Sequence, residues 1–458
     1  MSGPFLTSMD STVVNVSLSS LARELHSSLT DIQWVTSGYL LALALMLPLS
    51  GWLVDRIGAR NLYLICFSSF TGASVFCGLA WSTPSLIGFR VLQGIVGGLL
   101  APMAQMMVAR AAGKQMARVM GYAVLPIMIG PIFGPVLAGS ILHHASWRWL
   151  FYINLPIGLL AITLALLWLP NDQEKTNRRT FNFAGFAMLS PGLVLFLYGL
   201  DHTSHRIGQF SLGIAVLLLV AFVAYAMHKG SHALIDVRLF RRPAFSAAAS
   251  TQFLSNGAVF AGQLLVPLYL MDVCHFSPTS TGWLLAPVGL GMLCSYPLMG
   301  ILTDRFGVRR VSASGAFLAL LGTLPFAFMA QYRLMIPVLA VALFIRGAGL
   351  GSINIPSISA AYASVAKKDL PMATTAINIV QRLGGPVMTT LVAIFLEWKL
   401  VPDRSSVMVM KPFAAAFWLL SGIHGLAFLS AMRLPAFIVH RSEKEENPEN
   451  QAVEAFAE

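Results

Sequence analysis

Long apolar stretches separated by short polar ones run along almost the whole chain. A window of about 19 residues finds fourteen such stretches. They lie near 4–22, 32–54, 61–80, 84–108, 118–142, 149–169, 182–200, 209–228, 244–271, 281–303, 311–330, 334–358, 371–397 and 412–433. Apolar residues in them do not alternate with polar ones, which favours helices over barrel strands. The pattern therefore predicts an all-α membrane protein with fourteen transmembrane helices.

Composition supports a membrane environment. Of the 458 residues, 56% are hydrophobic and 11% are charged, and the mean hydropathy is +0.72. Water-soluble domains carry about 25% charged residues. In lipid, helices satisfy every backbone hydrogen-bonding group internally. The four cysteines lie in or beside apolar stretches without a zinc-binding spacing, so we interpret them as small buried hydrophobes and expect no metal site.

The net charge of +11 is explained by Lys and Arg in the predicted loops, without a patch that binds nucleic acid. Of the thirty Lys and Arg, twenty fall on the side that holds both termini, seven on the opposite side and three inside predicted spans. Positive charge marks cytoplasmic loops. We therefore expect a multi-pass protein of the cell inner (plasma) membrane with both termini in the cytoplasm, and no nucleic-acid partner.

Two pairs of similar strings indicate an internal duplication. GWLVDRIGAR (51–60) returns as GILTDRFGVR (300–309), and Arg90 in LIGFRVLQGIVGG has a counterpart, Arg346, in ALFIRGAGLGS. The offsets of 249 and 256 residues nearly agree. Such repeats predict two parallel six-helix bundles. We assign 1–170 and 244–434 to the bundles, 171–243 to a two-helix insert with charged flanks, and 435–458 to a disordered cytoplasmic tail.

Five motifs, in order, resemble those of the fourteen-helix drug:proton antiporters of the major facilitator superfamily. These motifs are LTSMDSTVVNV (6–16), GWLVDRIGAR (51–60), RVLQG (90–94), GPIFGP (130–135) and WRWLFYINLP (147–156). The resemblance covers nearly the whole chain. It implies the major facilitator fold and proton-coupled export of small amphipathic or toxic molecules.

The two loop motifs are predicted to hold the cytoplasmic ends of the bundles together. Their glycines permit tight turns and close helix approach, while their charged side chains can pair with helix ends or with acidic groups. The alternative is a short solvated loop that is held cytoplasmic by its arginines. The residues concerned are Gly51, Asp55, Arg56, Gly58, Arg60, Gly300, Asp304, Arg305, Gly307 and Arg309.

Asp10 and Arg90 are the candidate proton-coupling residues. Asp10 is the acidic residue that lies well inside a predicted span, where a carboxylate costs about 2.5–3.5 kcal/mol and needs a partner, water or a proton. Arg90 is the one charged residue within its predicted span. We hypothesise that protonation of Asp10 loosens its contact with Arg90 or its neighbours. A static ion pair that fixes helix packing is the alternative.

Two further groups of residues are candidates for the transport cycle. The stretch 118–142 combines glycines and prolines, so it should be bent and closely packed. Its antiporter motif contains Gly130, Pro131, Gly134 and Pro135. Polar side chains inside other spans are candidates for a central substrate path: Asn15, Gln93, Asn354, Asn378, Gln381 and Arg382.

Other functional classes fit less well. The chain has no GxxxxGK[ST] string for ATP, no HExxH, and no nucleophile constellation, so we expect neither an enzyme nor a cofactor. Duplicated halves argue for alternating access over a channel or receptor. An exporter dedicated to one metabolite, such as an amino acid or siderophore, stays open. The expected partners are a small-molecule substrate, protons and the bilayer. We expect a monomer. Whether a periplasmic adaptor also binds is left open by the sequence.

Overall fold

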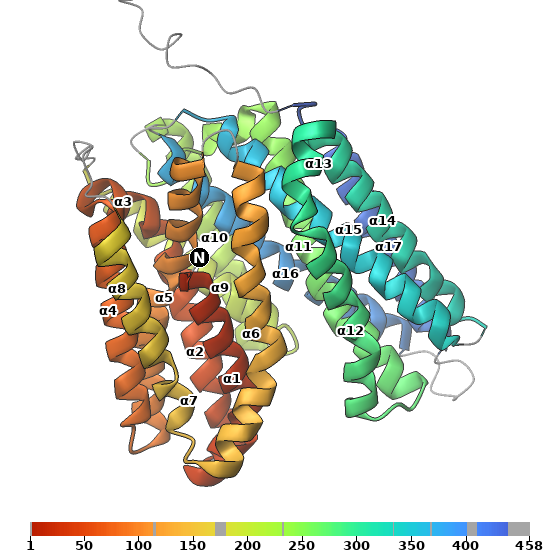
Figure 1. The fold of residues 1–458 in the computed structure, drawn as a ribbon, viewed down its shortest axis with the longest axis horizontal. Helices are drawn as coiled ribbons and strands as arrows, with labels where there is room; N and C mark the ends of the chain where they lie inside the picture. The colour runs from red at the N-terminus through yellow and green to blue at the C-terminus, as the bar shows by residue number, and fades with distance from the viewer. Residues whose placement is uncertain are drawn as a thin grey trace, which may run out of the picture.

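The computed structural model describes residues 2–112, 116–169, 180–230, 233–332, 334–366, 369–400 and 410–437. Helices dominate this part of the chain, and no strand occurs in it. The helices form two bundles that lie side by side, and Figure 1 shows the first in red to gold and the second in green to blue. The charged stretch 171–179 and most of the predicted tail, residues 438–458, lie outside the described residues.

The first bundle is built from the first six predicted stretches. Its elements are α1 (Ser2–Glu24), α2 (Leu29–Met46), η1 (Leu47–Leu49), α3 (Ser50–Ile57), α4 (Ala59–Gly78), α5 (Thr83–Ala112), α6 (Met116–His144), α7 (Trp149–Tyr152) and α8 (Asn154–Trp168). Within the bundle, α1 packs against α6, α2 against α5, and α4 against α5 and α8. These contacts bring α1, α2, α4, α5 and α8 together around the bundle interior.

The second bundle repeats this arrangement. It comprises α11 (Pro243–Leu268), η5 (Tyr269–Val273), α12 (Pro278–Ser295), α13 (Leu298–Phe306), α14 (Val308–Met329), α15 (Ile336–Ala363), α16 (Leu370–Leu400) and α17 (Met410–Ala431). Here α11 packs against α16, α12 against α15, and α14 against α15 and α17. The α12–α15 pair corresponds to the α2–α5 pair of the first bundle.

The insert consists of α9 (Phe183–Asp201) and α10 (Arg206–Lys229), followed by η4 (Val237–Arg241). The two helices pack against each other, and α9 also contacts α2, η1 and α16. In Figure 1 they lie between the bundles, behind the helices at the front. The insert therefore touches both halves of the molecule.

Each of the fourteen predicted stretches overlaps a helix or a bent pair of helices. Among the described residues, eleven helices are long and apolar enough to cross a membrane, or twelve if the pair α12 and α13, bent by 55°, is one span. Helices α1 and α6 are not among them. Fourteen spans therefore stay a prediction, whereas the helical membrane fold is confirmed.

The two loop motifs adopt the same backbone turn. Gly58 ends α3 with φ 89° and ψ 155°, and Gly307 ends α13 with φ 83° and ψ 161°. Each glycine amide donates to a carbonyl four residues earlier at 2.9 Å, Val54 in one motif and Thr303 in the other. A positive φ strains any residue with a Cβ. The repeated glycine therefore follows from the repeated turn.

Small residues allow the central helices of each bundle to touch. A Cβ on Gly94 or Gly98 of α5 would overlap backbone oxygens of α2. A Cβ on Gly347 or Gly351 of α15 would overlap Val288 or Ser295 of α12. Helices in lipid associate through close packing rather than through hydrophobic exclusion. The small-xxx-small spacing thus positions α5, which carries Arg90.

Substituting Gly98 by valine is expected to destabilise the protein. The new side chain meets the Leu43 carbonyl in the buried α2–α5 contact, and overpacking of this kind costs about 1–3 kcal/mol. Gly88→Val on the same helix is the matched control, because Gly88 is exposed and no heavy atom lies within 4 Å of its added Cβ. Thermal unfolding in detergent should show a lower midpoint for G98V alone. Equal midpoints would contradict the packing argument.

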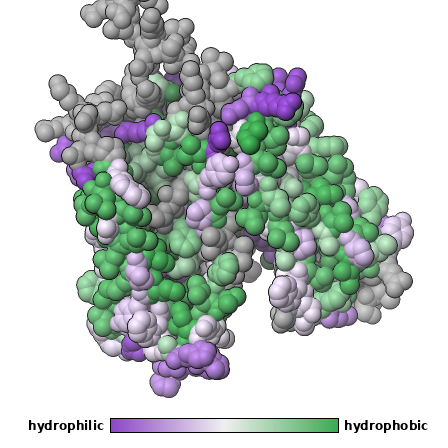
Figure 2. Space-filling view, viewed as in Figure 1, coloured by the Kyte–Doolittle hydropathy of each residue, from purple (hydrophilic) through white to green (hydrophobic). Residues whose placement is uncertain are grey.

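The halves meet at the end of the molecule that carries both loop motifs. Figure 1 shows α3 and α13 at this upper end, and Figure 2 shows the bundles separated by a notch at the opposite end. Hydrophobic side chains form a broad belt over both bundles, with hydrophilic ones gathered toward the ends. The structure is therefore closed at the end with the loop motifs and open at the other.

Candidate transport site

Asp10 lies on α1 with 1% of its surface exposed. Its Oδ2 atom is 2.5 Å from Arg90 Nη1 on α5, in a fully buried ion pair. Its Oδ1 atom accepts hydrogen bonds from Asn154 Nδ2 at 2.7 Å and from Gln93 Nε2 at 3.3 Å. Both carboxylate oxygens are thus bonded to side chains from two other elements, α5 and α8.

Further buried side chains hold the donors in place. Gln93 donates to Ser74 Oγ on α4 at 2.8 Å, and its Oε1 accepts from Arg90 Nη1 at 2.6 Å. Arg90 Nε donates to the Val35 carbonyl on α2 at 3.2 Å. The guanidinium carbon lies 4.1 Å from the centre of the Tyr39 ring, a cation–π contact. Five elements of the first bundle therefore converge on one carboxylate.

The hydrogen bonds of this cluster depend on the negative charge of the Asp10 carboxylate. The charged form of Asp10 is the acceptor for three donors, and charge-assisted hydrogen bonds are about twice as strong as neutral ones. Protonation removes the charge that compensates Arg90 and turns one oxygen into a donor. The contacts among α1, α5 and α8 depend on the protonation state of this group.

Sequence reasoning paired Asp10 with Arg90 but placed Gln93 on a substrate path, and it missed three members of the cluster: Asn154, Ser74 and Tyr39. Asn154 lies in the quoted WRWLFYINLP string, where it is the first residue of α8. The amide side chain of Asn154, at the start of an apolar helix, could have indicated a buried hydrogen-bond partner. Ser74 and Tyr39 carried no such signal, because hydroxyl groups are common in apolar helices.

The antiporter motif on α6 supports the segment of α1 that carries Asp10. A Cβ added at Gly130 would lie 3.0 Å from the Met9 amide nitrogen, and one at Gly134 would lie 2.9 Å from Thr12 Cγ2. Met9 and Thr12 flank Asp10 in the sequence. The side chains of Pro131 and Pro135 lie outside the described residues. The two glycines thus set the distance between α6 and the coupling residue.

Each loop motif contacts the opposite bundle through its first glycine. A Cβ at Gly51 on α3 would lie 2.9 Å from the Pro371 carbonyl oxygen on α16. A Cβ at Gly300 on α13 would overlap the backbone of Arg118 on α6. Neither position has room for a side chain while the halves are closed at this end.

The last arginine of each motif binds the end of the sixth helix in its own bundle. Arg60 Nη2 donates to the Leu166 carbonyl at 3.2 Å in the last turn of α8. Arg309 Nε donates to the Leu434 carbonyl at 2.6 Å, just beyond α17. Cations are stabilising at helix C-termini.

The other charged members of the loop motifs lie nearer to solvent. Asp55 is half-buried and engaged in an interaction, whereas Arg56, Asp304 and Arg305 are exposed. Arg305 lies over the Phe306 ring at 5.4 Å. Exposed charges on this face agree with the solvated-loop alternative for these three residues, while the glycines and the last arginines make structural contacts.

Direct hydrogen bonds join the two halves near the loop motifs. Gln105 Oε1 on α5 accepts from Tyr362 on α15 and from Asn378 on α16, both at 2.9 Å. Ser50 Oγ on α3 and Thr375 Oγ1 on α16 share a hydrogen bond of 2.8 Å. We call these five residues the polar gate. Any state that opens at this end has to break these bonds.

Replacing Gln105 by leucine is expected to shift the protein toward states open at the polar gate. The change leaves the Tyr362 hydroxyl and the Asn378 amide without this acceptor, a loss of about 1–3 kcal/mol for the closed form, and so shifts the equilibrium roughly 5- to 150-fold. Spin labels at positions 56 and 305, in a background without the four native cysteines, should report longer distances. Gln105→Glu keeps an acceptor and should retain the short distance. Unchanged distances in Q105L would show that the gate is not needed for closure.

The second bundle has a guanidinium without a carboxylate partner. Arg346 is 3% exposed and donates from Nη2 to the Ala258 carbonyl on α11 at 3.0 Å. Gly262, one turn later, leaves the space that the guanidinium occupies. In the described part of the chain no carboxylate lies within ion-pair distance of it. The duplication therefore extends to the arginine but not to Asp10.

The candidate path residues do not form one continuous lining. Asn15 is exposed on α1, Gln93 is buried in the Asp10 cluster, and Asn378 is bonded in the polar gate. Asn354, Gln381 and Arg382 are half-buried in the second bundle. The Asn354 and Gln381 carbonyls accept hydrogen bonds from Gln252 and Asn256 of α11.

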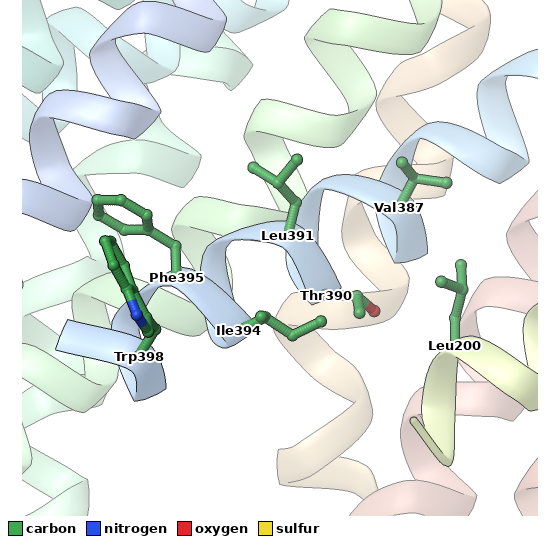
Figure 3. A pocket seen from close by; sticks show the side chains of 7 residues that line it. All are labelled: Leu200, Val387, Thr390, Leu391, Ile394, Phe395 and Trp398. Atoms are coloured by element: carbon green, nitrogen blue, oxygen red, sulfur yellow. The ribbon is translucent and has the colours of Figure 1, made fainter. Parts of the chain in front are cut away.

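An apolar cavity of about 480 Å³ lies between α9 and α16. Leu200 lines it from α9, and the outer half of α16 supplies the rest of the wall (Figure 3). The α16 residues are Val387, Thr390, Leu391, Ile394, Phe395 and Trp398. Thr390 brings a hydroxyl into an otherwise apolar surface, so the cavity suits the apolar part of an amphipathic molecule.

Residues 1–255 and 248–457 each match the family model of the Major Facilitator Superfamily. The chain belongs to this superfamily. It is 35% identical over 399 residues to the "Multidrug resistance protein B homolog" of Mycobacterium tuberculosis (strain ATCC 25618 / H37Rv), covering 85% of this chain and 74% of the relative. It is 31% identical over 414 residues to the "Putative multidrug resistance protein MdtD" of Salmonella heidelberg (strain SL476), covering 88% and 87%.

Solved structures agree with the fold. The proton:xylose symporter XylE, bound to 6-bromo-6-deoxy-D-glucose, superimposes with a TM-score of 0.61 at 16% identity, covering 92% of each chain. At this identity the likeness concerns the fold alone. The expected major facilitator fold is thereby confirmed, and the chain is a multi-pass membrane protein of a transporter superfamily.

Proposed function

We propose that this superfamily member is a proton-coupled antiporter that exports small amphipathic or toxic molecules. The printed names of the two relatives, both multidrug resistance proteins, support the substrate class. The observation that carries the coupling is the Asp10–Arg90 ion pair, buried in one bundle and bonded on both carboxylate oxygens. An ionisable group at this depth is expected to have a functional role.

The cycle requires two states that differ at the two ends of the molecule. In the structure the polar gate is closed and the opposite end is open, so a substrate in the cleft faces outward. Binding of a proton to Asp10 weakens the bonds that tie α1 to α5 and α8. Rearrangement of the first bundle then opens the polar gate, and loss of the proton to the cytoplasm restores the ion pair.

The orientation follows from charge. Arg56, Arg305 and the arginines of η4 lie at the end with the loop motifs, and positive residues favour the cytoplasmic side. We therefore propose that both termini are cytoplasmic in the inner membrane. An entering proton is then driven by the membrane potential, which contributes about 2.3 kcal/mol per charge per 100 mV.

We also propose the organisation 1–170, 171–243 and 244–434 for the first bundle, the insert and the second bundle. Each bundle contains a hydrophobic core of its own, and a further core joins both bundles and the insert, which contacts α2 and α16. The protein is proposed to work as a monomer, because one chain supplies both of the bundles that alternating access requires. Transport, rather than an enzymatic reaction, is the proposed activity.

Purified protein in liposomes tests this proposal. An imposed pH gradient should drive uphill movement of an amphipathic dye, and the flux should saturate with dye concentration. Dissipating the gradient with an ionophore should stop net movement. Conductance without saturable flux would indicate a channel, and flux that ignores the pH gradient would refute proton coupling.

A further inference from the structure

Arg382 is a cation in the middle of α16, and no described carboxylate forms an ion pair with it. It lies half-buried on the helix that packs against α11 of its own bundle and also contacts α3, α5 and α9 across the molecule. Within the described ranges it makes no ion pair and no hydrogen bond through its guanidinium. A cation in this position needs an anion or water around it.

The first bundle places the aromatic ring of Tyr39 near Arg382. Arg382 is close enough to Tyr39 on α2 for the two side chains to interact electrostatically across the halves. Tyr39 also stacks on Arg90 at 4.1 Å. Tyr39 therefore lies near both the Asp10–Arg90 pair and Arg382.

Among the residues that the structure describes, no carboxylate is placed to neutralise Arg382. Asp10 is committed to Arg90, Asn154 and Gln93. The other acidic residues that the structure describes lie at helix ends or in connections: Glu24, Asp31, Asp55, Asp201, Asp236, Asp272, Asp304, Asp369 and Glu397. With the ion pair neutral, Arg382 gives the middle of the transporter a net positive charge.

We propose that Arg382 binds the carboxylate of an amphipathic organic acid, and that the preferred cargo of this exporter is therefore anionic. Guanidinium groups bind carboxylates through paired, charge-assisted hydrogen bonds. Val387 of the apolar cavity follows Arg382 by five residues on α16, which is roughly 7.5 Å along the helix and about 140° around it. The cavity therefore lies on another face of α16, and the preference for anions follows from the charge of Arg382 alone.

The charge distribution does not by itself release such an anion. A proton on Asp10 leaves Arg90 uncompensated and makes the interior more positive, so the proton does not itself repel an anion. Release follows when the open cleft fills with water, because attraction between charges falls about fourfold as the effective dielectric rises from about 20 to about 80. Protons and cargo are then coupled through the alternating states rather than by direct repulsion.

A matched pair of probes tests this inference, which rests on the proposed export function. The probes are 1-naphthoate and its uncharged amide, 1-naphthamide, which share one apolar skeleton. Calorimetric titration of the purified native protein should give tighter binding for naphthoate. Arg382→Gln should weaken naphthoate binding by about tenfold to a hundredfold and change naphthamide binding by less than about twofold. Arg382→Lys keeps the charge and should retain most of the preference for the acid.

Several outcomes would overturn the inference. Equal affinities of the two probes for the native protein would overturn the inference without any variant. The inference therefore stays testable even if R382Q folds poorly. Equal losses for both probes in R382Q would indicate a structural arginine. Preference for a cationic probe of the same skeleton, 1-naphthylmethylammonium, would indicate the opposite charge class. If the native protein shows pH-driven export without preferring acids, this inference alone fails, whereas absence of any pH-driven export refutes the proposed function.

Discussion

Asp10→Asn is expected to abolish export driven by a pH gradient while leaving exchange of substrate across the membrane in place. Asparagine keeps the shape of the side chain and an oxygen for Asn154, but it cannot take up or release a proton. Net uphill flux in liposomes should fall to the level of protein-free vesicles. Counterflow, in which labelled substrate exchanges for unlabelled substrate at equal pH, should continue at a measurable rate.

The two assays separate coupling from folding. A D10N protein that loses both activities has lost its structure or its substrate site. Thermal unfolding in detergent separates the two cases, because only a loss of structure lowers the midpoint. Ser19→Ala on the same helix is the control, because Ser19 is exposed and outside the Asp10 cluster. Uphill export by a well-folded D10N protein would remove Asp10 from the coupling mechanism and leave it as part of a static pair.

Arg90→Met is expected to cause the largest loss of stability among single changes at the site. It leaves the Asp10 carboxylate buried and without a cation, and breaking one side of a buried ion pair costs about 3–5 kcal/mol. The double variant D10N/R90M removes both charges and should recover much of that loss. Midpoints of thermal unfolding in detergent compare the stabilities of the single and double variants. The resulting double-mutant cycle measures the interaction between Asp10 and Arg90.

Arg346→Met is the matched control for this cycle. Arg346 is the corresponding arginine of the second bundle, is equally buried, and donates to a backbone carbonyl instead of a carboxylate. Its replacement leaves no unpaired anion, so the loss should be smaller and D10N should not rescue it. If R346M were as damaging as R90M, or if D10N rescued both equally, the stability of the first bundle would not depend on the specific pair.

The sequence predicted most of the helices because a membrane helix can be recognised from the hydropathy of its own residues. A stretch of about 20 apolar residues has few alternatives to a helix in lipid, and all fourteen predicted stretches overlap helices. The repeated loop strings predicted a duplicated architecture, and the matching turns at Gly58 and Gly307 agree with it. The depth of Asp10 and Arg90 in apolar helices likewise marked them as partners.

Other features depended on which helices touch. Asn154 is 144 residues from Asp10, and Gln105 is more than 250 residues from its partners Tyr362 and Asn378. A single sequence carries no signal for contacts at such separation when the residues are ordinary amides and hydroxyls. Likewise, Gln93 and Asn378 were expected on a substrate path, and the structure places them in the Asp10 cluster and the polar gate.

By itself, then, the sequence determined that this protein spans a membrane as two related helical bundles and carries a carboxylate that needs a partner. Lipid imposes those properties on each helix separately, through hydropathy and the cost of buried charge. Only the tertiary structure decided that Arg90, Asn154 and Gln93 share that carboxylate, that the halves close at the loop motifs, and that no carboxylate in the described part of the chain neutralises Arg382. These properties arise from contacts between distant helices, and such contacts are set by packing geometry that no local stretch encodes.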